Sequence, residues 1–430
     1  MQTKNPLTSK SNWKNLVIAA PLLVTFNLKA QTWSNVGSGM NGYVLALTEY
    51  NGNLYAGGAF NTAGGNPANN IAMWNGSSWS AVGAGVNNTV HALTVFNGNL
   101  YVGGDFKTAG GNPASEIAEW NGTTWSALGA GLQGTYYNSG FTGGVFALTS
   151  YNGNLYASGQ FDSAGGNPVN YVAEWNGTSW LALGAGAPMY GVYALTVYNG
   201  DLYDGGWFGV EDWNGSSWTT PGSGLAGGSI YALTVYNGNL YAGGQIYPFN
   251  NVAEWNGTAW SALGTGTNNP DHGVDALIVY NGSLYAGGQF DTAGGHPASN
   301  IAAWNGTTWS ALGAGVNAWD SAFVVYNGCL FTGGIFTMAG GNSANYVATW
   351  CTPSSIDGVA GITNKKPPYP NPSSSFIHLN YNFPEGINAA EMVITNISGQ
   401  VVKTFKVGNA SNLFGVSSAK LCFAFCIFAG

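Results

Sequence analysis

Aromatic and acidic side chains gather in the least repetitive segments of this 430-residue chain. Flat aromatic faces stack on sugar rings, and carboxylates accept hydrogen bonds from hydroxyl groups. The sequence therefore predicts a site for a neutral carbohydrate, with the alternative that these side chains only anchor the loops that carry them. The predicted ligand-binding residues are Tyr136, Tyr137, Tyr190, Trp207, Trp319, Asp271 and Asp275.

Acid–base catalysis is a second use for such carboxylates, as in hydrolases and lyases that act on carbohydrates. Asp271, Asp275 and Asp320 are the candidates for it. The chain contains no Gly-x-Ser-x-Gly segment, no phosphate-binding loop and no zinc motif. We therefore assign no catalytic residue, expect no cofactor and favour a binding protein over an enzyme.

A metal site requires three or four ligands that converge. The histidines of the central region are His91, His272 and His296. His272 and His296 share one unit and one face with Asp271 and Asp275 nearby in sequence, but satisfied or exposed loop histidines are the better interpretation, and we predict no metal site. Four acids recur at one position of the repeated unit described below, where they either form a ladder that binds cations or pair at an outer surface. They are Glu119, Glu174, Asp212 and Glu254.

The charge pattern excludes one large class of partner. All ten basic residues are Lys, and residues 31–352 contain one of them, Lys107, against fifteen Asp and Glu. Binding of nucleic acid requires a basic surface, which this region does not have. Enzymes that clamp carboxylate or phosphate groups with Arg are excluded as well.

One unit is repeated seven times over residues 31–352. The first six units each contain two Asn-Gly pairs and the last contains one, and an Asn-Gly pair between two apolar runs predicts a tight hairpin turn. Residues 92–96, 99–104, 117–120 and 124–128 show the four short strands expected in a unit. The Tyr of the second strand marks the repeat at Tyr55, Tyr101, Tyr156, Tyr203, Tyr241, Tyr285 and, as Phe, at Phe331.

Seven four-stranded units in series predict an all-β chain folded as a seven-bladed β-propeller. The Gly-Gly after the second strand, the Trp-Asn-Gly turn and the final Trp resemble the kelch family of propellers. The marker Trp33 precedes the first complete unit, and the last unit, 322–350, has no fourth strand. We therefore expect the N-terminal strand at 31–36 to close the last blade, which hides the sheet edges.

Two cysteines lie in the last unit, Cys329 at the start of its second strand and Cys351 at the end of its third. Antiparallel neighbours place these positions side by side at one end of the blade. We predict a disulfide between them, against the alternative of two free thiols. Such a bond would join the strands next to the place where the ring closes.

The two ends of the chain are predicted to direct its delivery. Lys10 and Lys14 precede the apolar run 16–26, and a small residue, Ala30, follows, so residues 1–30 indicate a signal peptide. The mature chain would begin at Gln31 in an oxidising compartment. No other segment is long and apolar enough for a transmembrane span.

The composition changes after Thr352, where residues 353–366 indicate a linker and residues 367–430 a small β-sandwich-like module. Tyr-Pro-Asn-Pro at 369–372 and Ile-Thr-Asn-Ile-Ser-Gly-Gln-Val-Val at 394–402 resemble the C-terminal sorting domain of type IX secretion cargo, an export system of the Bacteroidetes type. After about residue 408 the pattern departs from that family, so we expect an atypical or truncated end.

These features predict a secreted or outer-membrane-surface protein that binds or adheres without catalysis. Its expected partners are a polysaccharide or a cell-surface protein and, through the C-terminal module, the secretion machinery. Two alternatives stay open: a carbohydrate-active hydrolase or lyase that uses acids of the loop face, and a purely structural surface repeat protein.

Overall fold

The computed structural model describes residues 31–134, 143–187, 191–225, 228–269 and 273–351, and five strands between residues 376 and 429. The chain divides into a unit of Gln31–Cys351 and a unit that contains both ends, Met1–Ala30 and Thr352–Gly430. The expected signal peptide and linker lie outside the described residues. No helix among those residues could cross a membrane.

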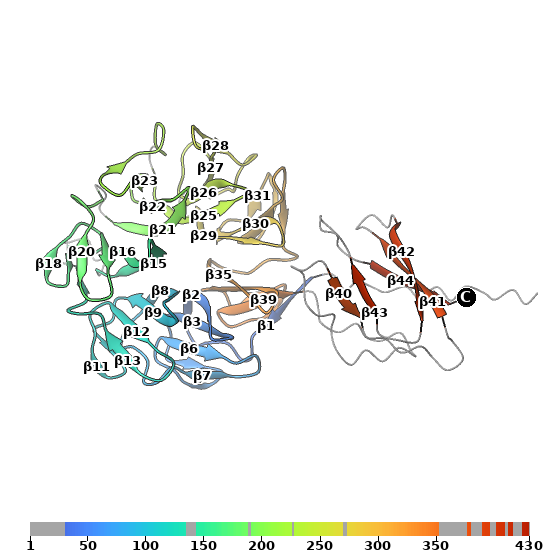
Figure 1. Ribbon diagram of the computed structural model, residues 1–430, viewed down its shortest axis with the longest axis horizontal. Helices are drawn as coiled ribbons and strands as arrows, with labels where there is room; N and C mark the ends of the chain where they lie inside the picture. Colours follow the sequence, from blue (N-terminus) through green and yellow to red (C-terminus); the bar gives the residue numbers. More distant parts are fainter. Residues whose placement is uncertain are drawn as a thin grey trace, which may run out of the picture. The chain divides into compact units, whose positions relative to one another are not determined.

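Residues 31–351 form seven four-stranded antiparallel sheets around a common centre, as a β-propeller does (Figure 1). The first strand of each sheet lies nearest the centre and contacts the first strands of both neighbours. We number the sheets 1 to 7 after these strands: β2 (Tyr43–Tyr50), β8 (Val90–Phe96), β15 (Val145–Tyr151), β21 (Val192–Tyr198), β25 (Ile230–Tyr236), β29 (Gly273–Tyr280) and β35 (Asp320–Tyr326).

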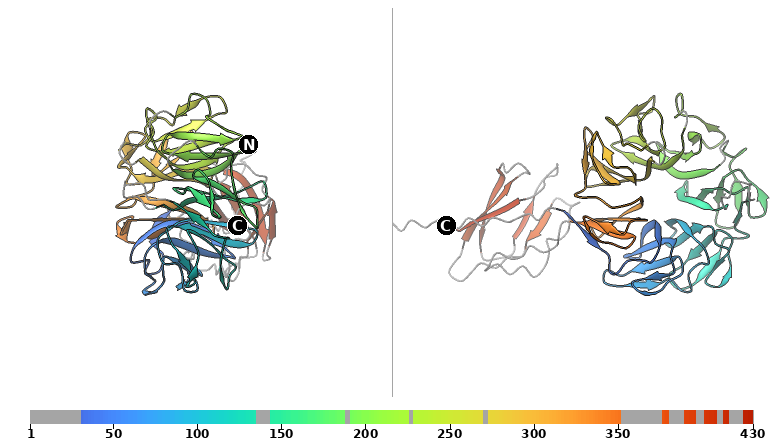
Figure 2. Two further views of the ribbon diagram at one scale, coloured as in Figure 1. Left: turned by 90° about the vertical axis from the view of Figure 1, so that its left-hand side faces the viewer. Right: turned by 180° about the vertical axis from the view of Figure 1, so that it is seen from behind.

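The remaining strands follow outward in each sheet, which is also seen from behind in Figure 2. The second strands are β3 (Asn53–Ala59), β9 (Asn99–Gly104), β16 (Asn154–Gly159), β22 (Asp201–Gly206), β26 (Asn239–Gly244), β30 (Ser283–Gln289) and β36 (Cys329–Gly334). The third strands are β6 (Ile71–Trp74), β12 (Ile117–Trp120), β19 (Val172–Trp175), β23 (Gly209–Trp213), β27 (Val252–Trp255), β33 (Ile301–Trp304) and β39 (Val347–Cys351). The outermost strands are β7 (Trp79–Ala81), β13 (Trp125–Ala127), β20 (Trp180–Ala182), β24 (Trp218–Thr219), β28 (Trp260–Ala262), β34 (Trp309–Ala311) and β1 (Thr32–Asn35).

The two Asn-Gly pairs of a unit make different turns. Asn97 and Gly98 both have positive φ, as a type I′ hairpin requires. At the second pair only Gly122 has positive φ, and the side-chain Oδ1 of Asn121 accepts hydrogen bonds from the backbone N–H groups of Thr123 and Thr124. The second turn is therefore held by an Asn side chain rather than by the type I′ geometry.

The loops between second and third strands share one face of the propeller with the connections between sheets. In sheets 1, 2, 3, 6 and 7 these loops contain a short hairpin, such as β4 (Thr62–Ala63) with β5 (Asn66–Pro67). Met40, in the connection that enters sheet 1, forms a bridge with Ala63 of that hairpin. We call this side of the propeller the loop face. Sheets 4 and 5 have no such hairpin among the described residues.

The N-terminal strand closes the ring, as predicted. β1 pairs antiparallel with β39, with Trp33 opposite Trp350. The indole of Trp33 is 6% exposed and donates a hydrogen bond from Nε1 to the carbonyl of Leu312, at 2.8 Å, in the connection from sheet 6. The other outermost Trp residues make the same bond to the preceding connection, for example Trp79 to Val36 at 2.9 Å. The Trp series therefore joins neighbouring sheets.

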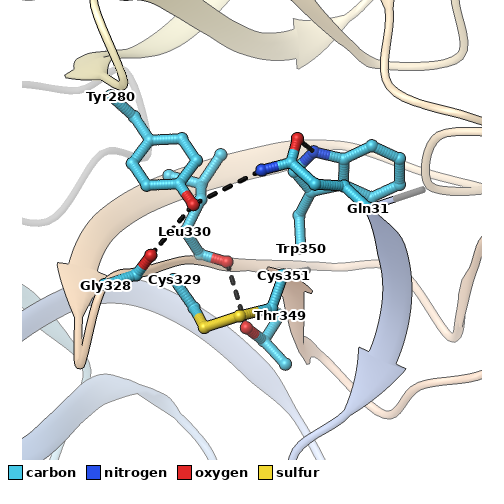
Figure 3. The surroundings of a disulfide bond; sticks show 8 residues. All are labelled: Gln31, Tyr280, Gly328, Cys329, Leu330, Thr349, Trp350 and Cys351. Carbon is cyan, nitrogen blue, oxygen red and sulfur yellow. Dashed lines mark hydrogen bonds between the residues drawn. A yellow bond between two sulfur atoms is a disulfide. The ribbon is translucent and has the colours of Figure 1, made fainter. Parts of the chain in front are cut away.

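Cys329 and Cys351 form a disulfide that joins β36 to β39, with their Cα atoms 4.9 Å apart (Figure 3). Cys351 lies opposite Thr32 of the closing strand. Next to the disulfide, Trp350 donates a hydrogen bond from Nε1 to the side chain of Gln31 at 2.7 Å. The covalent bond thus lies at the place where the two ends of the propeller meet.

The second unit contains two small antiparallel sheets. β40 (Phe376–Leu379) pairs with β43 (Asn412–Gly415), and β41 (Ala389–Thr395) lies between β42 (Val401–Gly408) and β44 (Ala424–Ala429). β43 and β44 lie beyond residue 408, so strands continue into the segment whose sequence departs from the sorting-domain pattern.

Loss of the closing indole should destabilise the whole propeller. Trp33→Ala removes a buried ring and the hydrogen bond to Leu312, so we expect the free energy of unfolding to fall by about 3–5 kcal/mol in denaturant melts. The control is Trp207→Ala. Because the Trp207 ring is 43% exposed, its loss should lower the free energy of unfolding by less than about 1 kcal/mol. Equal stability of the Trp33 variant and the parent would contradict closure by this strand.

Loss of the disulfide should lower the free energy of unfolding by less than loss of Trp33. Unlike that loss, it can be produced by a reductant. The bond closes a loop with a sequence separation of 22, for which chain entropy predicts about 3 kcal/mol. We expect a reductant to lower the melting temperature of the parent and to leave Cys329→Ser/Cys351→Ser unchanged. Alkylation of both thiols under non-reducing conditions, detected by mass spectrometry, would show that the bond does not form.

Candidate functional site

The central channel is lined by one variable side chain from each sheet. Each first strand has a register shift just before its repeated Ala, so one residue there is left out of the regular pairing. Such a bulge re-aims a side chain. The first strands surround the centre of the ring (Figure 1). From the bulge on these strands we infer that the following partly buried residues face the channel: Leu45, His91, Phe146, Tyr193, Tyr231, Asp275 and Ser321.

Four of these side chains form a continuous aromatic arc. The ring centroids of His91 and Phe146 are 5.1 Å apart, those of Phe146 and Tyr193 are 5.5 Å apart, and those of Tyr193 and Tyr231 are 5.5 Å apart. Each contact joins neighbouring sheets, from sheet 2 to sheet 5. We call this set, His91, Phe146, Tyr193 and Tyr231, the channel arc.

Polar side chains at the ends of the second strands hold the channel arc in place. The carboxylate of Asp105 lies 3.0 Å from Nε2 of His91, and the amide of Gln160 donates to the hydroxyl of Tyr193 at 3.5 Å. Gly144 leaves the space for Asp105, because a Cβ there would lie 2.2 Å from Oδ1 of that carboxylate. Asp105 belongs to the same sheet as His91, whereas Gln160 belongs to the sheet before that of Tyr193.

Asp275 continues the wall of the channel beside the arc. Burial raises the pKa of its carboxyl to about 7 from an ordinary value of 3.8. Burial also raises the pKa of Tyr231, and the negative charge of Asp275 adds to that shift. A carboxyl group that titrates near pH 7 can donate or accept a proton at neutral pH.

A cleft of about 630 Å³ opens between sheets 6 and 7 on the loop face, and it reaches Gln289 at the end of β30. Most of its amide groups are occupied by the fold itself. For example, the side-chain Oδ1 of Asn317 accepts from the backbone N–H groups of Thr337 and Met338. Gln289 differs, because its buried Oε1 has no hydrogen-bond partner within the described residues.

The predicted ligand-binding residues fall into four groups. Asp275 lines the channel, Trp207 lies exposed in the turn between β22 and β23, and Trp319 is partly buried directly before β35. The other four lie outside the described residues: Tyr136, Tyr137, Tyr190 and Asp271. Asp320 was expected to be a candidate acid of the loop face, and this expectation is wrong. Its side chain is fully buried between sheets and accepts a hydrogen bond from Thr332.

Sequence reasoning missed the channel arc. It identified the repeated Ala of the first strand but not the variable residue before it. The available signal was that this position holds six residue types in the seven repeats, from Leu45 through His91 to Ser321, between positions that hardly change. The bulge that turns it toward the channel depends on pairing and is not written in the local pattern.

The recurring acids of the third strands pair with their own sheets. Glu119 accepts hydrogen bonds from Asn99 at 2.6 Å and from the hydroxyl of Tyr101 at 3.2 Å. Glu174 and Glu254 accept from the Asn at the same position of their sheets, and Asp212 accepts from Thr219 at 2.5 Å. These contacts favour pairing at the outer surface over a ladder of cation sites.

Comparison with known proteins confirms the sorting domain. Residues 368–421 match the family model described as the secretion system C-terminal sorting domain. The match continues past residue 408, where the sequence pattern had led us to expect it to fail. No curated protein matches the chain.

Two of the solved structures similar to this chain come from bacteria. The extracellular domain of the putative hybrid two component system BT4673 from B. thetaiotaomicron is 10% identical, with a TM-score of 0.50 over 88% of this chain and 47% of that one. PorZ, a bacterial surface component of the type-IX secretion system of Porphyromonas gingivalis, is 13% identical, with a TM-score of 0.47 over 91% and 60%. The chain spans about half the length of the first of these.

The first likeness supports the propeller fold alone, since identity is low. Together with the sorting domain it defines the class: this is a secreted or cell-surface β-propeller protein that carries a type IX secretion sorting domain. The sorting domain implies contact with the secretion machinery. The kelch assignment stays a prediction.

The raised pKa of Asp275 should make stability depend on pH. Between about pH 4 and pH 7 the unfolded chain has released this proton and the folded chain has kept it, so stability falls as pH rises. Burial also raises the pKa of Asp204, Glu211 and Asp320, and these groups contribute with the same sign. We expect Asp275→Asn to lose less stability than the parent between pH 4 and pH 7. If the stability of the two proteins changes equally between pH 4 and pH 7, the raised pKa of Asp275 is contradicted.

Proposed function

We propose that the propeller is a non-enzymatic binding protein of the cell surface or medium, and that its channel arc binds a neutral carbohydrate at the loop face. The observation that carries this proposal is the unbroken series of rings from His91 to Tyr231. Partly exposed aromatic faces next to polar groups suit the alternating apolar and hydroxyl surfaces of a sugar.

The charge of the propeller supports a neutral ligand over an anionic one. Lys107 is the one basic residue of residues 31–352, and its Nζ lies 2.5 Å from the carboxylate of Glu116. The same region has fifteen Asp and Glu against this one Lys, so an acidic polysaccharide would approach a surface of net negative charge. Like charges oppose such an encounter over distances up to about 8–10 Å at physiological salt.

Asp275 favours one alternative, a carbohydrate-active enzyme that uses an acid of the loop face. Its pKa of about 7 and its place beside Tyr231 are what a general acid in the channel would require. Release of product from a panel of polysaccharides, abolished by Asp275→Asn, would establish catalysis in place of simple binding.

A glycan array with the exported chain tests the binding proposal. We expect Tyr193→Ala and Phe146→Ala each to weaken binding about fivefold, since a stacking contact contributes about 1 kcal/mol and each 1.4 kcal/mol is a factor of ten. Trp207→Ala is the matched control from the exposed turn of sheet 4.

Two results would move the proposal elsewhere. Loss of binding in Trp207→Ala with none in the channel variants would place the site on the exposed turn. No binding by the folded parent would favour recognition of a surface protein or a purely structural repeat protein.

A further inference from the structure

Six of the seven seams between neighbouring sheets contain a large apolar side chain from the loop that follows the second strand. It stands two residues after the Gly-Gly pair, or after Ser158-Gly159 in sheet 3, and is 0–5% exposed. These residues are Phe60, Phe106, Phe161, Ile246, Phe290 and Phe336. The equivalent in sheet 4 is Phe208, which is 62% exposed. The seam between sheets 3 and 4 therefore lacks this side chain.

Polar side chains face that seam instead. Tyr156, Leu202 and Trp213 belong to its apolar cluster. Alternate residues of a strand face the same side of a sheet. Ser158 on β16, Asp204 on β22 and Glu211 on β23 each stand two residues from one of those three, so all three face the seam from its two walls.

These polar side chains are buried and incompletely paired. Ser158 and Asp204 are fully buried, and Glu211 is 8% exposed. Four oxygen atoms have no hydrogen bond of good geometry within the described residues: Oγ of Ser158, both carboxylate oxygens of Asp204 and Oε2 of Glu211. The nearest compensation for Asp204 is the backbone N–H of Glu211. Asp204 and Glu211 are directly opposite each other in the ladder. Two buried carboxylates in one place are costly unless a cation or hydrogen bonds compensate them.

The other seams show that the fold does not require these groups. The positions of Asp204 and Glu211 are occupied by an Ala–Ala pair in sheets 1, 3, 5 and 6, for example Ala242 with Ala253. The seam between sheets 4 and 5 also lacks a loop hairpin, yet it keeps Ile246 and has no unpaired oxygen at these positions. The seam of sheets 3 and 4 is therefore special in its chemistry and not only in its loop length.

We propose that the seam between sheets 3 and 4 is a Ca²⁺ site, with Asp204, Glu211 and Ser158 as its side-chain ligands. Two carboxylates balance the charge of a divalent ion, and all four unpaired atoms are oxygens, which hard cations prefer. No group of three or more His, Cys, Asp or Glu in the described residues is placed to hold a metal, so the set relies on a hydroxyl in addition to two acids.

Ca²⁺ fits this donor set better than Mg²⁺. The donors come from two sheets that were not built as an octahedron, and Ca²⁺ accepts six to eight oxygens in flexible geometry, with water or backbone carbonyl groups completing the shell. Mg²⁺ requires near-ideal octahedral geometry and gives up its water reluctantly.

The test uses the full mature chain after treatment with EDTA, followed by titration with CaCl₂. We expect isothermal titration calorimetry to show one Ca²⁺ per chain, and the melting temperature to rise by roughly 4 °C at a hundredfold excess over Kd. Asp204→Ala/Glu211→Ala should lose both responses. Glu119→Gln, which changes a paired acid of the outer surface, should keep them.

The double variant also separates a lost site from a lost fold. It builds the Ala–Ala pair that sheet 5 already uses, so it should fold and should melt above the parent in EDTA, where the parent keeps two uncompensated acids. A parent that binds no Ca²⁺, or a double variant that binds it as well as the parent, would overturn the proposal. Glycan binding by the channel variants is measured independently, so the two proposals fail separately.

Discussion

The propeller depends on one constraint: no sheet can bury its apolar faces alone. Each seam is filled from two sheets, and each outermost Trp donates a hydrogen bond to the connection from the sheet before it. The series is satisfied only if sheet 7 also meets sheet 1, which requires β1 to pair with β39. The closing strand, the indole of Trp33 and the disulfide at Cys351 all serve that junction.

The features that recur in every unit were predictable from the sequence, because they are local or follow from counting. The Asn97–Gly98 turn is specified by two residues, and the position of Trp33 ahead of the first complete unit indicates which strand closes the ring. The residues of the channel arc and Asp320 were not predictable. Which way each points depends on a bulge and on strand register, and the repeat pattern carries neither.

Departures from the repeat are therefore the places where function can be sought. The seven bulge positions of the channel hold a different set of side chains around a constant scaffold, from the rings of the arc to the acid at Asp275. The seam of sheets 3 and 4 replaces a buried ring and two alanines with oxygen donors. In both places the scaffold provides rigidity, and the exceptional residues provide the chemistry.

The hydrogen bond between Gln31 and Trp350 spans 319 residues. Contacts this distant in sequence slow folding, because the entropy of closing a long loop is lost before the contact is made. Until then β39 presents an unpaired edge, and the strand that fits it is free at the other end of the molecule. Two unfinished chains close together could exchange these strands, as in a domain swap. Such an exchange would become more frequent as the chain concentration rises.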